Sequence, residues 1–199
     1  DGRVLATAGG SGAITLWDAR THQRLVRLGA DLSSQITGLS FSRGGELLAS
    51  GAADGSIRVW DMRTHQQRGA PLTGHLEGVT GVLFGPKEQI ISSSWDGTVR
   101  FWRTRDPRQD ESPPLVGHRR EVTSAAFSPD GKTLVSSSND GTVRLWSVRT
   151  HRQIGRLVVT PRSTQWVSDA VFSPDGDMVA AAVTDHVVLW DVRTHRQMS

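Results

Sequence analysis

The sequence predicts an all-β fold, a β-propeller of four-stranded antiparallel blades. The first observation is a series of similar units that each end in a tryptophan, with 42 to 44 residues from one tryptophan to the next. The second is the alternation of apolar and polar residues in short runs, which is typical of strands. Units of about forty residues built from short strands are typical of propeller blades. The five tryptophans are Trp17, Trp60, Trp102, Trp146 and Trp190.

The fourth unit shows the pattern of one blade most clearly. Its first strand is followed by Ser128-Pro129-Asp130-Gly131, and such a Pro-Asp-Gly run favours a turn. The second and third strands flank Asn139-Asp140-Gly141, which favours a tight hairpin. The four strands are predicted over 122–127, 133–138, 142–146 and 153–158.

The same offsets divide the chain into five units. The first begins at Asp1-Gly2, which aligns with Asp130-Gly131, so it lacks an opening strand, and the fifth shows about three strands. We therefore expect eighteen strands in a single propeller domain of about four and a half blades, an incomplete ring that exposes apolar faces at its terminal blades. These faces offer a route to association. The expected units are approximately 1–30, 31–73, 74–116, 117–158 and 159–199.

Three features recur at fixed offsets and carry a resemblance. They are a Gly-His pair before the first strand, an Asp-Gly turn, and a Trp-Asp pair at Trp17-Asp18, Trp60-Asp61 and Trp190-Asp191. Together they resemble the WD-repeat β-propeller family over essentially the whole chain. The repeated Arg-Thr-His turn is also similar to the WD-repeat arrays of bacterial signalling proteins. The resemblance implies a binding scaffold rather than an enzyme.

Two sets of polar residues could be mistaken for Ser-His-Asp catalytic triads. The resemblance instead implies two structural tetrads, in which the polar groups of one blade satisfy one another. No Gly-x-Ser-x-Gly turn is present to expose a nucleophile. We therefore predict no catalytic residue and no cofactor. The tetrads are His75, Ser92, Asp96 and Trp102, and His118, Ser136, Asp140 and Trp146.

The tetrad is incomplete in other units. The second unit keeps Ser50, Asp54 and Trp60 but has Leu32 where the histidine would fall, and in the fifth unit Ala181 replaces the serine.

The resemblance places partner contacts at the rim that carries the tetrad aspartates. Trp95 and Trp166 are the two tryptophans that the repeat does not account for, and an exposed indole at a rim is a typical interface anchor. The alternative is that each packs over a neighbouring loop. The remaining candidates lie beside the turn or where first strands begin: Thr80, Glu121, Thr123, Asn139 and Ser168.

Composition excludes several other classes of site. The chain has no cysteine, which leaves no thiolate ligand or disulfide and favours a cytoplasmic location. Its net charge of +3 is small, and the pI near 10.4 reflects a preference for arginine, so nucleic-acid binding is not predicted. No run of about 20 apolar residues predicts a membrane span.

A recurring Arg-Thr-His turn lies at the opposite rim, at 20–22, 63–65, 149–151 and 193–195. The four histidines belong to different units without a second ligand at close spacing, so we predict no metal site. The arginines could bind a polyanion, or the turn could be a solvated loop that duplication repeated.

Two function classes remain. The first is a non-enzymatic scaffold that binds a protein or peptide at the top rim. The second is a sensory or regulatory module of a bacterial multidomain signalling protein, a kinase or nucleotide-switch protein, whose catalytic part lies outside this sequence. A propeller enzyme would need polar residues converging on the central channel or a metal, and the sequence shows no such cluster.

Overall fold

The computed structural model describes residues 2–29, 33–103, 113–158 and 166–198. In these ranges the regular structure consists of β-strands and one 3₁₀ turn, η1 (Pro86–Glu88). The predicted all-β class is therefore confirmed. None of the described residues belongs to a helix that is long and apolar enough to cross a membrane.

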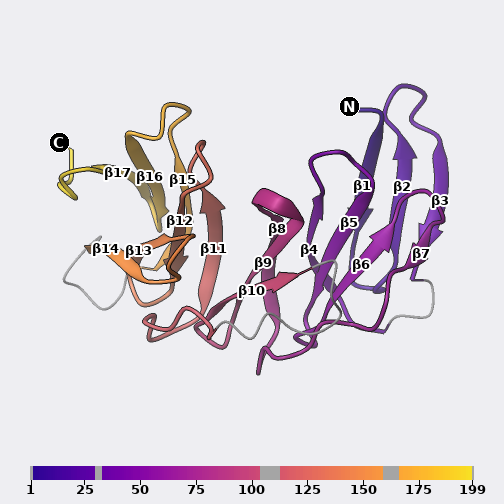
Figure 1. Ribbon diagram of the computed structural model, residues 1–199, viewed down its shortest axis with the longest axis horizontal. Helices are drawn as coiled ribbons and strands as arrows, with labels where there is room; N and C mark the ends of the chain where they lie inside the picture. The colour runs from indigo at the N-terminus through magenta and orange to yellow at the C-terminus, as the bar shows by residue number, and fades with distance from the viewer. Residues whose placement is uncertain (1, 30–32, 104–112, 159–165, 199) are drawn as a thin grey trace. The chain divides into compact units, whose positions relative to one another are not determined.

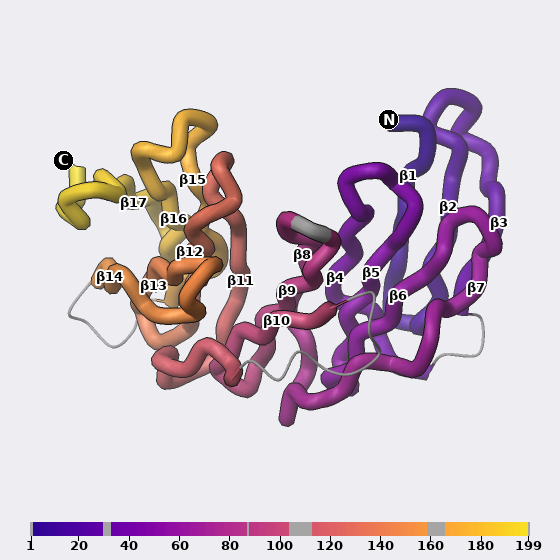
Figure 2. The backbone as a smooth tube through the Cα atoms, viewed as in Figure 1, coloured from indigo at the N-terminus to yellow at the C-terminus, as the bar shows by residue number. Residues whose placement is uncertain are grey.

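The strands form five antiparallel sheets, and within each sheet consecutive strands lie side by side (Figures 1 and 2). This meander is the arrangement that short turns between strands impose. In chain order the sheets contain β1 (Val4–Ala8), β2 (Ile14–Asp18) and β3 (Arg24–Leu28); β4 (Ile36–Phe41), β5 (Leu47–Ala52), β6 (Ile57–Asp61) and β7 (Gln66–Gln67); β8 (Val79–Phe84), β9 (Gln89–Ser94) and β10 (Val99–Arg103); β11 (Val122–Phe127), β12 (Thr133–Ser138), β13 (Thr142–Ser147) and β14 (Gln153–Val158); and β15 (Val167–Phe172), β16 (Met178–Val183) and β17 (His186–Asp191).

The described residues hold seventeen strands, one fewer than the eighteen expected. The difference lies in the third sheet, where Leu115 makes only an isolated bridge to Val99. Pro113 and Pro114 precede Leu115 and have no N–H to donate to a ladder, which limits pairing on this edge. The fourth strand of the second sheet is also short, since β7 has two residues and Leu72 adds a bridge to Ile57.

The chain forms two compact units. The first unit comprises Asp1–Ser92 with Phe101–Glu111, and the second comprises Ser93–Arg100 with Ser112–Ser199. The first two sheets and β8 belong to the first unit, and the last two sheets belong to the second. The division passes through β9 and β10, so parts of these strands fall in each unit.

In the first unit Trp60 and Trp102 each pack against the sheet that precedes their own. Trp60 lies with Ile14, Leu16 and Leu28 in one buried cluster between the first and second sheets. Trp102 lies in another, against side chains of the second sheet that include Val59. Both indoles are almost fully buried, so the repeat period is fixed by apolar burial.

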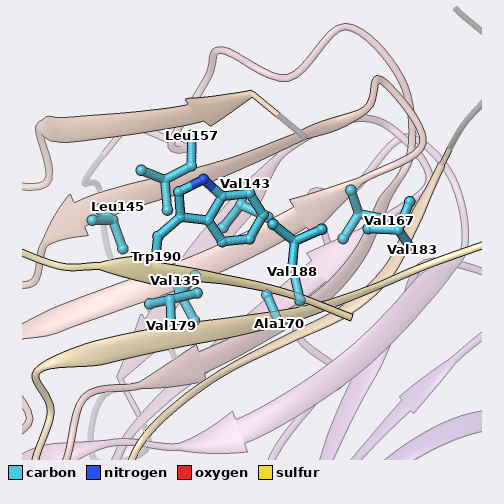
Figure 3. Packing of buried hydrophobic residues seen from close by; sticks show 11 residues of the cluster. Val135, Val143, Leu145, Leu157, Val167, Ala170, Val179, Val183, Val188 and Trp190 are labelled. Atoms are coloured by element: carbon cyan, nitrogen blue, oxygen red, sulfur yellow. The ribbon is translucent and has the colours of Figure 1, made fainter. Parts of the chain in front are cut away.

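The second unit has the same organisation. Trp190 of the last sheet packs on Leu145, Leu157 and Val143 of the fourth sheet, and Figure 3 shows the indole surrounded by these side chains. The side chains of the last sheet that face this cluster alternate along β16, as strand geometry requires.

A hydroxyl near the start of the first strand links neighbouring sheets. Thr37 Oγ1 donates to the carbonyl oxygen of Val79 at 2.6 Å, and Thr123 Oγ1 donates to that of Val167 at 2.6 Å. Each threonine stands at a register shift in its sheet, between Ile36 and Gly38 or between Val122 and Ser124. The hydroxyl of this extra residue therefore bonds both to its own partner strand, at Gly51 or Ser137, and to the next sheet.

Candidate functional site

The fourth sheet holds a complete hydrogen-bonded tetrad. Trp146 Nε1 donates to Ser136 Oγ at 2.8 Å, and Ser136 Oγ lies 2.8 Å from His118 Nε2. The other ring nitrogen, His118 Nδ1, lies 3.2 Å from Asp140 Oδ2. The indole can only donate, so the serine hydroxyl accepts from it and donates to Nε2. The proton of the neutral ring then sits on Nδ1 and is donated to Asp140.

Burial and hydrogen bonding keep this tetrad in one protonation state. Burial of the imidazole lowers the pKa of His118, and this outweighs the opposite effect of Asp140. Burial would raise the pKa of Asp140, but hydrogen bonds from His118, Thr142 and the backbone of Arg119 hold that pKa well below its usual value. The pair is therefore a neutral imidazole beside a carboxylate at neutral pH.

The free energy of unfolding should consequently depend on pH through His118. An unfolded histidine has a pKa of about 6.5, so below that pH the unfolded chain binds a proton that the folded ring does not. Stability should fall as the pH is lowered from about 7.5 to about 5, with a slope of up to about 1.4 kcal/mol per pH unit from this group. Urea unfolding of the wild type and of His118→Gln at each pH measures the difference. Parallel stability curves for the two proteins would show that His118 does not contribute.

Asp140 acts in a lower pH range. Its folded pKa is depressed, so the stability that it contributes is complete above about pH 4 and is lost as the pH falls through the folded pKa.

The serine-tryptophan half of the tetrad recurs in other sheets. Trp102 Nε1 donates to Ser92 Oγ at 2.8 Å, and that oxygen lies 2.7 Å from His75 Nε2. Trp60 Nε1 donates to Ser50 Oγ at 2.9 Å in the second sheet. In the first sheet Trp17 Nε1 donates to Thr7 Oγ1 at 2.8 Å, but there the pair is exposed.

The burial and hydrogen bonds of Ser92 and Ser136 indicate a structural role. Ser92 is 1% exposed and Ser136 is fully buried, and both hydroxyls are bonded to an indole and an imidazole. A catalytic serine would need to reach a substrate, whereas these lie between a tryptophan and a histidine of their own sheet. The arrangement fixes the register of the strands in the third and fourth sheets.

The two unassigned tryptophans are exposed, in contrast to the repeat tryptophans of the last four sheets. Trp95 is 46% exposed in the turn between β9 and β10, and Trp166 is 55% exposed just before β15. Both belong to the second unit. An indole buries up to about 250 Å² when covered, so each is a large apolar surface that faces water.

Contacts within the second unit connect these two tryptophans along one edge. A Cβ on Gly97, in the turn of Trp95, would lie 3.2 Å from the carbonyl oxygen of Arg120. The next residue, Glu121, accepts from the backbone of Asn139 at 3.0 Å, and the side-chain amide of Asn139 lies 3.4 Å from the Glu121 carboxylate.

The same edge continues to the last sheet. Thr123 is hydrogen-bonded to the carbonyl oxygen of Val167, which directly follows Trp166. We call this edge the second-unit rim, and it comprises Trp95, Glu121, Thr123, Asn139, Trp166 and Ser168.

Three candidates stand at the second position of a first strand. The hydroxyl of Thr123 is used within the fold, since it bonds to Ser137 and to Val167. Ser168 Oγ donates to the carbonyl oxygen of Ala182 at 3.3 Å within its own sheet. Thr80 has the same offset in β8, where it is half-buried in the first unit. The structure therefore brings six of the seven candidates to one rim and places Thr80 in the other unit.

The Arg-Thr-His turns have a local structural cause that the sequence pattern did not reveal. His22, His65, His151 and His195 all have φ between 54° and 60°, in the left-handed region. The aspartate of the Trp-Asp pair holds the turn, because Asp18 Oδ1 accepts from the backbone N–H groups of Arg20 and Thr21. These hydrogen bonds lower the pKa of Asp18, and the bond from Thr21 has the largest effect. A signal was present, since histidine is among the residues enriched at positive φ.

Substitution of His22 tests this explanation. His22→Gly should leave the free energy of unfolding unchanged or raise it, because glycine adopts positive φ without a steric penalty. His22→Val should lower it by about 1–2 kcal/mol, since a β-branched side chain is strained there. Urea denaturation followed by tryptophan fluorescence measures both. Equal stabilities for the two variants would contradict a backbone role.

The second feature that the sequence did not reveal is a cavity of about 170 Å³ in the first unit, lined by residues that include Ser50, Asp54 and Arg58. The signal was the missing tetrad histidine of this unit, whose position at Leu32 lies outside the described residues. No group of three or more His, Cys, Asp or Glu side chains that could hold a metal occurs among the described residues.

Comparison with known proteins points to one family. The family model described as "WD domain, G-beta repeat" matches residues 23–61, 66–103, 111–147 and 155–191. Each match starts shortly before the first strand of one sheet, in the strand or loop that precedes it. It then continues to the end of the third strand of that sheet. All four matches end at or directly after a repeat tryptophan, so they contain the tetrad positions.

Curated proteins give the same indication over parts of the chain. The chain is 29% identical to periodic tryptophan protein 2 of Arabidopsis thaliana over 135 residues, which are 67% of this chain and 15% of that protein. It is 38% identical to coronin-7 of Rattus norvegicus and 40% identical to coronin-7 of Mus musculus, in each case over 65 residues, 32% of this chain and 7% of the relative. The chain thus spans a small part of the length of these relatives.

Proposed function

Since the chain belongs to the WD-repeat family, whose repeats generally mediate protein–protein interaction, we propose that it is a non-enzymatic scaffold that binds a protein or peptide at the second-unit rim. The observation that carries the proposal is the exposure of Trp95 and Trp166, at 46% and 55%, on a rim whose other members are polar. Interface hot spots typically consist of an aromatic side chain that becomes buried on binding and polar residues around it.

The polar members of the rim suit an extended peptide. Glu121 offers a carboxylate and Asn139 an amide, side by side, and between the two indoles they can accept and donate hydrogen bonds to a peptide backbone. The rim rests on paired strands, so the two indoles are held by a rigid support. Thr80 has the equivalent position of the repeat in the first unit and remains a separate predicted partner contact.

Selection of displayed peptides on the intact chain tests the proposal. Peptides that bind the wild type should lose at least tenfold in affinity to Trp95→Ala combined with Trp166→Ala, because a truncated hot spot costs about 2 kcal/mol or more. The matched control is Ile154→Ala, which removes an exposed apolar side chain on β14, at the opposite edge of its sheet from β11. Urea unfolding of each variant checks that stability is retained.

Equal affinity for the wild type and the double variant would refute the rim as the binding surface. A large loss of stability in the double variant would instead favour the packing role of these tryptophans.

The last sheet provides a second surface for association. Its outer face exposes Val171, Val187 and Leu189. Leu189 pairs with Ala180 as Leu145 pairs with Val135 in the fourth sheet, and the latter pair is covered by the last sheet. The outer face of the last sheet therefore has the same apolar pattern as the face of the fourth sheet that the last sheet covers. We propose that a further blade packs on this outer face.

A role as the sensory or regulatory module of a bacterial signalling protein is the second candidate. The repeated Arg-Thr-His turn favours it by resemblance, although the positive φ of the histidines gives that motif a local cause. Kinase or nucleotide-binding sequence flanking the repeats in the parent gene would decide between the candidates. A cytoplasmic location belongs to either proposal and is based on the cysteine-free sequence.

A further inference from the structure

The turn between β4 and β5 lacks a carboxylate that two equivalent turns have. The fourth and last sheets carry Ser-Pro-Asp-Gly at 128–131 and 173–176, whereas the second sheet carries Ser-Arg-Gly-Gly at 42–45. The three turns share one backbone conformation, because the last glycine of each has a positive φ and donates its N–H to the carbonyl oxygen of the serine at 2.8–2.9 Å. Gly44 therefore stands where the other two turns have an aspartate.

In the turns that have the aspartate, two donors hold its carboxylate. Ser128 Oγ donates to Asp130 Oδ1 at 2.6 Å, and the backbone N–H of Lys132 donates to the same oxygen at 3.0 Å. The last sheet repeats both bonds at Asp175. The pKa of each aspartate is lowered, and the hydrogen bond from the serine has the largest effect. This pair of donors therefore stabilises a carboxylate.

In the second sheet the same two donors have no acceptor among the described residues. Ser42 is only 6% exposed, and its Oγ accepts the N–H of Leu47 at 3.0 Å, but no described residue accepts the serine proton. The backbone N–H of Glu46, which has the position of Lys132, also has no described acceptor. A buried hydroxyl that lacks an acceptor favours a ligand that supplies one.

A pocket of about 220 Å³ lies at this turn, within the first unit. Ser42, Arg43 and Gly44 form part of its wall. Cavities of about 150 Å³ hold a benzene ring, so the volume is sufficient for an aromatic ring with a short side chain. The rest of the wall is largely apolar and includes side chains of the first two sheets: Val4, Leu16, Leu25, Phe41 and Met62.

Three charged or titratable side chains surround the pocket. Arg43 and His65 line it, and both are exposed. The carboxylate of Glu46 lies over Gly44, since a Cβ on that glycine would be 3.2 Å from Glu46 Oε2. The Glu46 side chain is exposed, and its carboxylate makes no hydrogen bond or ion pair with a described residue, so it can move away. The arginine therefore favours an anionic ligand, and the glutamate opposes it.

We propose that this pocket binds a small carboxylate that carries an aromatic or branched apolar group. The hydroxyl of Ser42 and the N–H of Glu46 donate to the ligand carboxylate, which occupies the place of the missing aspartate side chain. The apolar group lies against the apolar wall, and the guanidinium of Arg43 provides the opposite charge. The carboxylate belongs either to a free acid or to the C-terminus of a peptide that ends in phenylalanine.

Titration of the intact ¹⁵N-labelled chain with 3-phenylpropionate at pH 7 tests the proposal. The backbone N–H signal of Glu46 should shift saturably, with a dissociation constant of about 1 mM, because this group gains an acceptor. The signal of Lys132 should stay in place, because its N–H is already bonded to Asp130. Acetate lacks the apolar group and 3-phenylpropanamide lacks the charge, so each should bind at least tenfold more weakly.

Gly44→Asp should abolish binding without loss of stability, because it restores the carboxylate that the equivalent turns have. The φ of Gly44 is not positive, so the backbone accepts an aspartate. Urea unfolding checks the stability, and Gly10→Asp, a glycine with open space around it in the turn between β1 and β2, is the control for the added charge. If Gly44→Asp does not fold, the comparison of acid and amide on the wild type still decides.

Two further variants test the charges. Glu46→Gln should strengthen the binding of 3-phenylpropionate about fivefold, because it removes a like charge at the site, and Arg43→Gln should weaken it by a similar factor.

Three results would overturn the proposal. The first is the absence of a saturable shift of Glu46 up to about 100 mM 3-phenylpropionate, a hundredfold above the expected dissociation constant. The second is an equal response to the acid and the amide, and the third is unchanged binding by a folded Gly44→Asp variant. Acetyl-glycyl-phenylalanine distinguishes the sources: tighter binding than 3-phenylpropionate assigns the site to a peptide C-terminus, and weaker binding assigns it to a free acid.

Discussion

Replacing Leu145 with alanine is expected to lower the free energy of unfolding by about 2–5 kcal/mol, whereas the same change at Leu189 is expected to cost less than about 1 kcal/mol. The two leucines occupy the same position in successive blades. Leu145 is fully buried between the fourth and last sheets, and Leu189 is 39% exposed on the outer face of the last sheet. The first substitution leaves a cavity in a packed core, and the second leaves a surface that water already reaches.

Urea unfolding of both variants at low protein concentration measures these costs. Leu189→Asp provides the associated test of self-association, because a charge on the proposed docking face should reduce assembly in analytical ultracentrifugation without loss of stability. A destabilisation by Leu189→Ala as large as that by Leu145→Ala would show that the outer face is covered in solution. It would contradict the exposure on which the prediction rests.

Ser136→Ala is expected to destabilise the chain by about 2–3 kcal/mol. Removal of one hydroxyl leaves two buried groups without their partner, the indole N–H of Trp146 and Nε2 of His118. Each such group costs about 1–3 kcal/mol when it is kept from water, although relaxation recovers part of the sum. The free energy of unfolding in urea is the quantity to compare.

Substitutions at two equivalent positions test whether the loss of stability follows the number of buried groups left without a partner. Ser50→Ala should cost about 1 kcal/mol, since only the N–H of Trp60 loses a partner and the adjoining polar cavity can supply water. Thr7→Ala should cost less, because water reaches the Trp17 indole in the first sheet. Equal costs at the three positions would mean that the hydroxyls act by volume rather than by hydrogen bonding.

The strands and turns could be predicted because their causes are local. Alternation of apolar residues gave 122–127, 133–138 and 153–158 with the bounds that the structure has. Family membership followed from the recurrence of Trp-Asp and Asp-Gly pairs at fixed offsets, and it is confirmed by the matched repeats. The seven partner contacts remain predictions.

Several properties could not be predicted from the pattern. The left-handed backbone of His22 and its equivalents accompanies a turn that the side chain of Asp18, or of Ser147 before His151, caps, and the enrichment of histidine at positive φ was too weak a signal to predict it. Among the described residues, the third sheet has three strands and one bridge at Leu115, because the preceding prolines have no N–H to donate to a fourth strand.

The sequence by itself determined the number of repeats, the strand order within each sheet and the identity of the polar positions, because these are set by local periodicity and by spacing along the chain. Only the tertiary structure decided the environment of each repeated position. Trp17 and Trp60 both donate to a hydroxyl ten residues away, yet one pair is exposed and the other buried. The physical reason is that burial depends on the neighbouring sheet, which the sequence of one repeat does not contain.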